Sequence, residues 1–288
     1  MIHPLAESWG EVLESSAADA LSSLDADEVI ARFRRRAALL FRGFTVSNTS
    51  FSQFTDRFSA GTLPALHAGL NRERVPGEDH TMTVDLGANL VGYHLEMGYS
   101  PARPDLLWFH CLSPATQGGE TILCDGVGML EKMEASLAAI FRARRIKYTF
   151  RGAGEALWSL FVGESVDREE ALRRLRHVPG LRAAASGAGA LDLEYVTSAI
   201  QRTRYAAVDA FVNSIIIFGP DVVSFEDGEP IGRDLRLEIA QLASDCSVDV
   251  RWRAGDVLLV DNSRLMHGRL PFKEGVRRIH VRMSAAAF

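Results

Sequence analysis

The sequence predicts an α+β fold in which one closed or sandwiched β domain is flanked by helices. Two strand patterns support this: residues 252–262 form a Gly-Asp turn followed by an apolar strand, and residues 277–283 alternate between basic and apolar side chains. Helical patterns over residues 127–145 and 169–176 are the second observation. A chain of 288 residues with 47% hydrophobic content can bury a large core. We therefore expect a single domain over residues 1–288.

The N-terminal part predicts helices around one strand. The first 35 residues have a helical composition, and Asp25–Glu28 is a helix-start signal. The basic run over residues 32–36 is interpreted as a solvated helix end. Residues 39–41 should form the first strand of the β domain, and residues 51–58 a second helix.

The middle of the chain combines a buried strand with a segment of small residues. Residues 106–112 are too apolar for a solvated edge, so we expect a buried strand, with His110 as a core histidine. Residues 180–190 contain mostly glycine and alanine. This composition predicts the most flexible stretch of the protein.

His94, Glu96 and His267 are candidate metal ligands. In a β-strand, residues i and i+2 project from one face, so the His94 imidazole and the Glu96 carboxylate can converge on one ion. Two histidines and one carboxylate, with the remaining positions open, are the ligand set of non-haem Fe(II) oxygenases. The pair alone is a weak signal, because 8 His and 37 acidic residues in 288 give about one His-x-Asp/Glu by chance.

The end of the chain places basic side chains on one strand face. His267 follows the apolar strand and its polar loop, and the Pro and Gly of residues 271–275 predict a turn. Period 2 then sets Arg278, His280 and Arg282 on one face of a returning strand. If that face points into the metal cavity, a planar guanidinium there is the preferred partner of a carboxylate.

These segments resemble the Fe(II)- and 2-oxoglutarate-dependent dioxygenases of the taurine dioxygenase (TauD/TfdA) superfamily. Residues 37–44 resemble the family's early strand, residues 118–121 its segment after the first ligands, and residues 255–267 with Arg277-Arg278 its C-terminal signature. The spacings agree too, because Thr121 lies 25 residues after Glu96, and Arg278 and Arg282 lie 11 and 15 residues after His267.

The resemblance implies a double-stranded β-helix core (jelly-roll, cupin-like) flanked by helices, and a function for each matched residue. His94, Glu96 and His267 would bind Fe(II) as the catalytic centre. Thr121 and Arg278 would hold the distal carboxylate of 2-oxoglutarate, and Arg282 would hold an anionic group of the substrate. Asn213 could reach the substrate, or could cap a turn at a strand end. The block over residues 150–215 separates the two halves of the ligand set, which suits a lid insertion.

The resemblance also implies the reaction. Fe(II), 2-oxoglutarate and O2 would act together, releasing succinate and CO2, with hydroxylation as the default outcome and desaturation or cyclisation as variants. Glu96 in place of the commoner Asp is similar to the clavaminate synthase and syringomycin-pathway hydroxylase branches. This favours a small substrate: an amino acid, a carrier-tethered amino acid or a natural-product intermediate. A zinc hydrolase and a non-catalytic metal-binding cupin remain as alternatives.

Charge and composition exclude several other classes. A net charge of −5 gives no basic footprint for nucleic acid or an anionic membrane. No apolar run reaches the roughly 18 residues of a membrane span, and the first residues lack a secretory signal. Three cysteines, at positions 111, 124 and 246, are an odd count that fits a reducing cytoplasm. A homo-oligomer is compatible with all of this.

Overall fold

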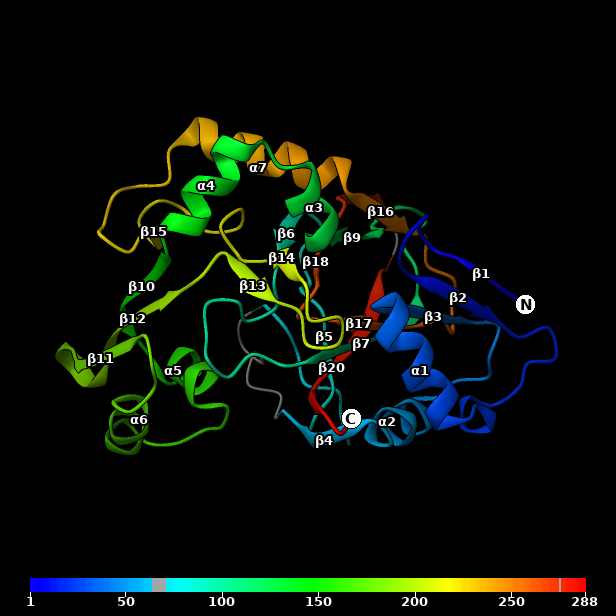
Figure 1. The fold of residues 1–288 in the computed structure, drawn as a ribbon. Helices are drawn as coiled ribbons and strands as arrows, with labels where there is room; N and C mark the ends of the chain where they lie inside the picture. The colour runs from blue at the N-terminus through cyan, green and yellow to red at the C-terminus, as the bar shows by residue number, and fades with distance from the viewer. Residues whose placement is uncertain (64–70, 275) are drawn as a thin grey trace.

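The computed structural model describes residues 1–63, 71–274 and 276–288, and its centre is a large mixed sheet (Figure 1). The strand order is β1 (Ile2–Pro4), β2 (Glu11–Glu14), β3 (Ala38–Arg42), β17 (Val257–Asp261), β7 (Leu106–Ser113), β20 (Arg278–Ala286) and β4 (Ser59–Thr62). The short strand β5 (Met82–Thr83) pairs with β20 as well. All neighbours are antiparallel except β2 and β3, which run parallel.

A smaller antiparallel sheet faces the large one. Its order is β16 (Ser247–Val250), β9 (Thr121–Asp125), β18 (Leu265–Arg269) and β6 (Val91–His94). Leu107, Phe109 and Leu258 of the large sheet share one buried core with Leu123 and Leu265 of the small sheet. The short strands β8 (Gln117–Gly118) and β19 (Phe272–Glu274) pair beside it. The predicted α+β class and the buried strand over residues 106–112 are confirmed; Gly275 of the predicted turn lies outside the described residues.

Two N-terminal helices cover the outer face of the large sheet. In α1 (Ala26–Arg36), the Asp25 side chain accepts a hydrogen bond from the Glu28 N–H, as its helix-start signal predicted. The helix α2 (Asn48–Asp56) packs Phe51 and Phe54 against the sheet. A short 3-10 turn, η1 (Leu21–Ser23), precedes α1. The expected helix over the first 35 residues is wrong before residue 21, because the segment of β2 gains its backbone partners from β3 and tertiary pairing overrides helix propensity.

Three further helices cover the outer face of the small sheet. They are α3 (Gly126–Lys132), α4 (Ala135–Ala143) and α7 (Arg233–Asp245). Their apolar residues Met129, Phe141 and Ile239 join one cluster with Met266 of β18. The single helix predicted over residues 127–145 is therefore two helices, because Met133 adopts an extended conformation between them.

An outer lobe lies on the far side of the molecule from β1 and β2 (Figure 1). It consists of α5 (Glu155–Val162), α6 (Arg168–Leu175) and a sheet in the order β11 (Leu181–Ala185), β12 (Leu191–Thr197), β10 (Ile146–Ala153), β15 (Val223–Phe225). A 3-10 turn η2 (Gly187–Gly189) joins β11 to β12, and the hairpin of β13 (Ile200–Arg202) and β14 (Asp209–Phe211) follows.

Part of the glycine and alanine run, which is predicted to be the most flexible stretch, forms the strand β11. Residues 181–185 pair with β12 along their whole length, and Leu181 is buried in the core of the lobe. The backbone pairing with β12 holds this strand in place, although most of its side chains are small. No helix of the described residues is long and apolar enough to cross a bilayer.

Candidate metal centre

Neighbouring strands of the small sheet bring the two candidate histidines together. His94, the last residue of β6, is the register partner of His267 in the middle of β18, and their ring centroids are 4.3 Å apart. The Nε2 atoms of His94 and His267 lie 3.8 and 3.4 Å from Oε2 of Glu96. All three residues are buried. Each offers a ligand atom within 4.8 Å of the others, and no second such group is found among the described residues.

The protonation of the histidines suits metal binding. Nδ1 of His94 lies 2.9 Å from the Gly92 carbonyl oxygen, which can only accept, so Nδ1 donates and Nε2 is the ring nitrogen that faces Glu96 and could bind a metal. Burial, and then the neighbouring His94, lower the pKa of His267 to about 4. At neutral pH its imidazole is therefore neutral, which is the form that coordinates metals. The donor set and its protonation fit a divalent transition metal.

Asn262 positions Glu96. The strand β6 ends at His94, so strand geometry alone does not orient the carboxylate. Instead, the Asn262 side chain accepts from the Glu96 N–H at 3.1 Å and donates to the Glu96 carbonyl at 3.0 Å and to the Pro104 carbonyl at 2.8 Å. One sequence signal could have found this residue, since an amide directly after an apolar strand needs a hydrogen-bond partner where it is buried.

We expect Asn262→Ala to destabilise the protein by about 2 kcal/mol or more, because it removes three buried hydrogen bonds, to the Glu96 N–H, the Glu96 carbonyl and the Pro104 carbonyl, at roughly 0.5–1.5 kcal/mol each. Urea unfolding of the metal-free protein measures the change. The exposed Asn89 is the matched control, and Asn89→Ala should stay within about 0.5 kcal/mol of wild type. An Asn262→Ala protein as stable as the control would contradict this role.

A cavity opens beside the three candidate ligands, and it contains arginines. Its lining includes His94, His267, Phe109 and Thr121, and the cationic side chains are Arg72, Arg269 and Arg277. Arg277 donates to the Gly119 carbonyl at 2.8 Å and to the Thr121 hydroxyl at 3.3 Å. Burial, and then the Arg269 cation, lower the pKa of Arg277 to about 10, so it stays charged at neutral pH. No carboxylate of the described residues forms an ion pair with it.

The basic face of the last strand points away from this cavity, which corrects two predictions. Arg278 is exposed and does not line the cavity. Arg282 is buried under α2, where it contacts Asp56 at 2.6 Å and Ser52 at 2.9 Å. Ile279, Val281 and Met283 form the face that packs into the core between the sheets. Arg277 has the same parity as these apolar residues, so it and not Arg278 reaches the cavity.

The other predicted residues have mixed outcomes. Thr121 lines the cavity, and its hydroxyl also accepts from Trp252 Nε1 at 3.0 Å. Asn213 does not line it; its side-chain oxygen accepts from the Ile215 N–H, which is the turn-capping alternative. His110 is a buried core histidine stacked on Phe51 with ring centroids 5.1 Å apart, and burial lowers its pKa to about 4.

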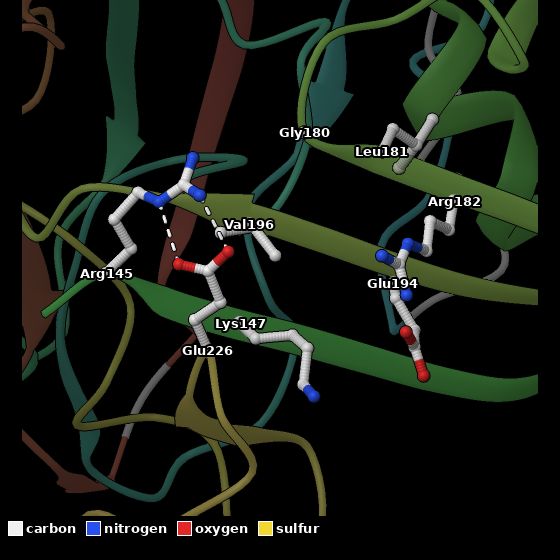
Figure 2. A pocket seen from close by; sticks show the side chains of 8 residues that line it. All are labelled: Arg145, Lys147, Gly180, Leu181, Arg182, Glu194, Val196 and Glu226. Atoms are coloured by element: carbon white, nitrogen blue, oxygen red, sulfur yellow. Dashed lines mark hydrogen bonds and ion pairs between the residues drawn. The ribbon is translucent and has the colours of Figure 1, made fainter.

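A second pocket lies on the outer lobe, and its chemistry is different (Figure 2). Lys147, Arg182 and Glu194 project from the exposed face of the β11–β12–β10 sheet, and Arg145 forms an ion pair with Glu226 beside them. None of the candidate metal ligands lines this pocket. The candidate centre is therefore the cavity between the two core sheets.

Comparison with known proteins gives one family. The family model described as taurine catabolism dioxygenase TauD, TfdA family matches residues 2–284. The dapdiamide synthesis protein DdaC of Enterobacter agglomerans is 24% identical over 88% of this chain and 83% of its own length. A clavaminate synthase-like protein of Arabidopsis thaliana is 25% identical over 82% of this chain and 78% of its own.

The fold is similar to that of a solved oxygenase structure. The structure of PvcB, described as an Fe, alpha-ketoglutarate dependent oxygenase from an isonitrile synthetic pathway, superposes with a TM-score of 0.63 at 17% identity. The match covers 99% of this chain and 91% of PvcB.

Proposed function

Because the chain belongs to the TauD/TfdA dioxygenase family, we propose that it hydroxylates a small-molecule substrate at the centre formed by His94, Glu96 and His267. Membership makes it a non-haem iron dioxygenase that uses Fe(II), 2-oxoglutarate and O2. One observation carries the assignment to these residues: three buried ligand atoms within 4.8 Å adjoin a cavity lined by Arg277, a half-buried arginine that forms no ion pair with a carboxylate of the described residues. The two facing sheets would be the double-stranded β-helix of this family.

The cosubstrate would bind through its distal carboxylate to Arg277 and Thr121. A guanidinium matches both oxygens of a carboxylate, and the buried setting strengthens the contact. Since the Thr121 hydroxyl accepts from both Trp252 and Arg277, its own hydrogen is free to donate to an anion. These contacts replace the earlier assignment of Arg278.

The residues of the cavity then perform three tasks. His94, Glu96 and His267 would hold the iron on one side only, so that other positions stay open. When bound, iron and 2-oxoglutarate supply the oxidising chemistry, in which one oxygen atom of O2 enters the substrate and the other enters succinate. Phe109, Val84 and Val91 line the same cavity with apolar surface, which limits water beside the reacting centre.

We propose a substrate of the natural-product type, an amino acid free or tethered to a carrier. The supporting observations are the dapdiamide synthesis relative and the isonitrile-pathway oxygenase of similar fold. A succinate-release screen with Fe(II) and O2 over amino acids, small acids and carrier-bound amino acids tests it. Product masses distinguish hydroxylation from desaturation or cyclisation, which lose two hydrogens. A zinc hydrolase or a non-catalytic metal-binding protein would release no succinate with any substrate.

The outer lobe would act as a lid over the site. Its residues 150–215 connect the segments that carry Glu96 and His267, and glycines and alanines over 180–190 provide few packing contacts. We expect hydrogen exchange of this block in the Fe(II)–2-oxoglutarate protein to slow when substrate is added. Strong protection of the whole block from exchange before substrate is added would contradict the lid and would indicate a rigid segment.

A further inference from the structure

Arg72 lies against the carboxylate of the candidate metal ligand. Its Nη2 atom is 3.4 Å from both Oε1 and Oε2 of Glu96. Its side chain is 14% exposed and lines the same cavity as His94 and His267. Its other terminal nitrogen, Nη1, is buried and has no hydrogen-bond partner in the described part of the chain. A buried N–H donor of a charged group is costly to leave unpaired, so this nitrogen is available to a ligand.

The backbone on both sides of Arg72 is fixed. Leu86 donates its N–H to the Asn71 carbonyl at 3.0 Å. Thr83 donates its N–H to the Glu73 carbonyl at 2.8 Å, and the Thr83 hydroxyl accepts from the Glu73 N–H at 2.9 Å. The backbone of Arg72 is therefore held between two anchored residues, and the contact with Glu96 orients its side chain in the cavity. Such pre-ordering lowers the entropic cost of binding an anion.

The net charge of the cavity also favours binding of an anion by Arg72. Among the described residues, the arginines and carboxylates that line the cavity or form ion pairs with its lining are three cations, Arg72, Arg269 and Arg277, and two anions, Asp85 and Glu96. Fe(II) brings two positive charges and 2-oxoglutarate two negative ones, so the loaded site keeps one positive charge. Arg269 already contacts Asp85 at 3.2 Å and two backbone carbonyls. With Arg277 assigned to 2-oxoglutarate, the uncompensated cation is Arg72.

We infer that Arg72 is a specificity-determining residue that binds an anionic group of the substrate, and that this group is a carboxylate close to the carbon that is oxidised. The inference rests on the proposed function, because it takes the iron and the cosubstrate as already bound. Contact with Glu96 keeps the guanidinium next to the metal ligands, so an anion on Nη1 lies beside the reacting centre. Arg72 thus takes the role expected of Arg282, whose guanidinium is instead committed to Asp56 and Ser52.

The test compares carboxylic acids with their own primary amides. The anaerobic Fe(II)–2-oxoglutarate protein is titrated calorimetrically with pairs from acetate and acetamide to alanine and alaninamide, and aromatic acids with their amides. The visible charge-transfer band of the complex shows that 2-oxoglutarate stays bound during each titration. We expect at least one acid to bind about 30-fold more tightly than its amide, as for one charge-assisted contact.

Arg72→Gln should remove this preference, and the band reports in the same titration whether 2-oxoglutarate is still bound to the variant. Arg72→Lys should restore part of the preference, because it keeps the charge but not the planar fork. The exposed Arg74, two residues away, is the matched control, and Arg74→Gln should behave as wild type. Circular dichroism confirms that each variant is folded.

Two results would overturn the inference alone: a wild-type protein with the band that binds no acid more tightly than its amide, or an Arg72→Gln protein that keeps the preference. A wild-type protein that never develops the band would contradict the proposed function itself, and the inference with it.

Discussion

His267→Ala should abolish iron binding at micromolar metal and reduce turnover below detection. The imidazole is buried, neutral at pH 7 and 3.4 Å from the Glu96 carboxylate, so its loss leaves two protein ligands for a labile Fe(II) ion. Equilibrium dialysis with Fe(II) under argon measures the binding, and succinate release measures turnover. His94→Ala and Glu96→Ala should also end turnover.

The control for this loss is a histidine elsewhere in the chain. His177 is exposed and follows α6 in the outer lobe, so His177→Ala should bind iron and turn over like wild type. A folded His267→Ala protein with near-normal turnover would remove the assignment of the centre to this cavity.

Arg277→Ala should raise the apparent constant for 2-oxoglutarate by about 30-fold or more, while iron still binds. Losing a charge-assisted contact to a carboxylate that stays buried costs about 2–5 kcal/mol. Arg277→Lys should have a smaller effect, because the ammonium keeps the charge but cannot meet both oxygens. Succinate release at varied 2-oxoglutarate gives the constant.

Arg278 provides an unusually close control, since it is the same residue type at the next position. Its side chain is exposed on the opposite face of the strand, so Arg278→Ala should leave the 2-oxoglutarate constant unchanged. The reverse pattern, with Arg278 affecting the constant and Arg277 not, would mean that the register of the last strand is wrong.

The convergence of His94, Glu96 and His267 could be predicted from the sequence, but the contacts that produce it could not. His94 and Glu96 converge as the alternation of a strand suggests, although the strand ends at His94. The Glu96 backbone is fixed by Asn262, which is 166 residues further along the chain. Sequence spacing cannot reveal such a distant contact.

The last strand shows a second limit. Alternation divided its side chains correctly into a basic and an apolar face, but it does not say which face is the inner one. The family resemblance, through the spacings of Arg278 and Arg282 from His267, places the basic face in the cavity. In the structure α2 supplies partners for that face instead, since Asp56 and Ser52 contact Arg282. Because neighbouring residues of a strand face opposite sides, the arginine that lines the cavity is Arg277 and not Arg278.

Arg72 had no sequence signal. It lies in residues 71–81, which precede β5 and contain no helix or strand of their own, and the sequence around it has neither strand nor helix periodicity. Its place beside Glu96 depends on backbone hydrogen bonds of its neighbours to Thr83 and Leu86. Only the folded arrangement brings this cation to the metal ligands.

The central claim is that His94, Glu96 and His267 hold an iron to which 2-oxoglutarate binds. Anaerobic addition of 2-oxoglutarate to the Fe(II) protein, followed by visible absorption, tests it most directly. We predict a weak charge-transfer band in the wild-type protein and in His177→Ala, and no band in His267→Ala. Absence of the band in the wild-type protein, or a band of full intensity in folded His267→Ala, would contradict the claim.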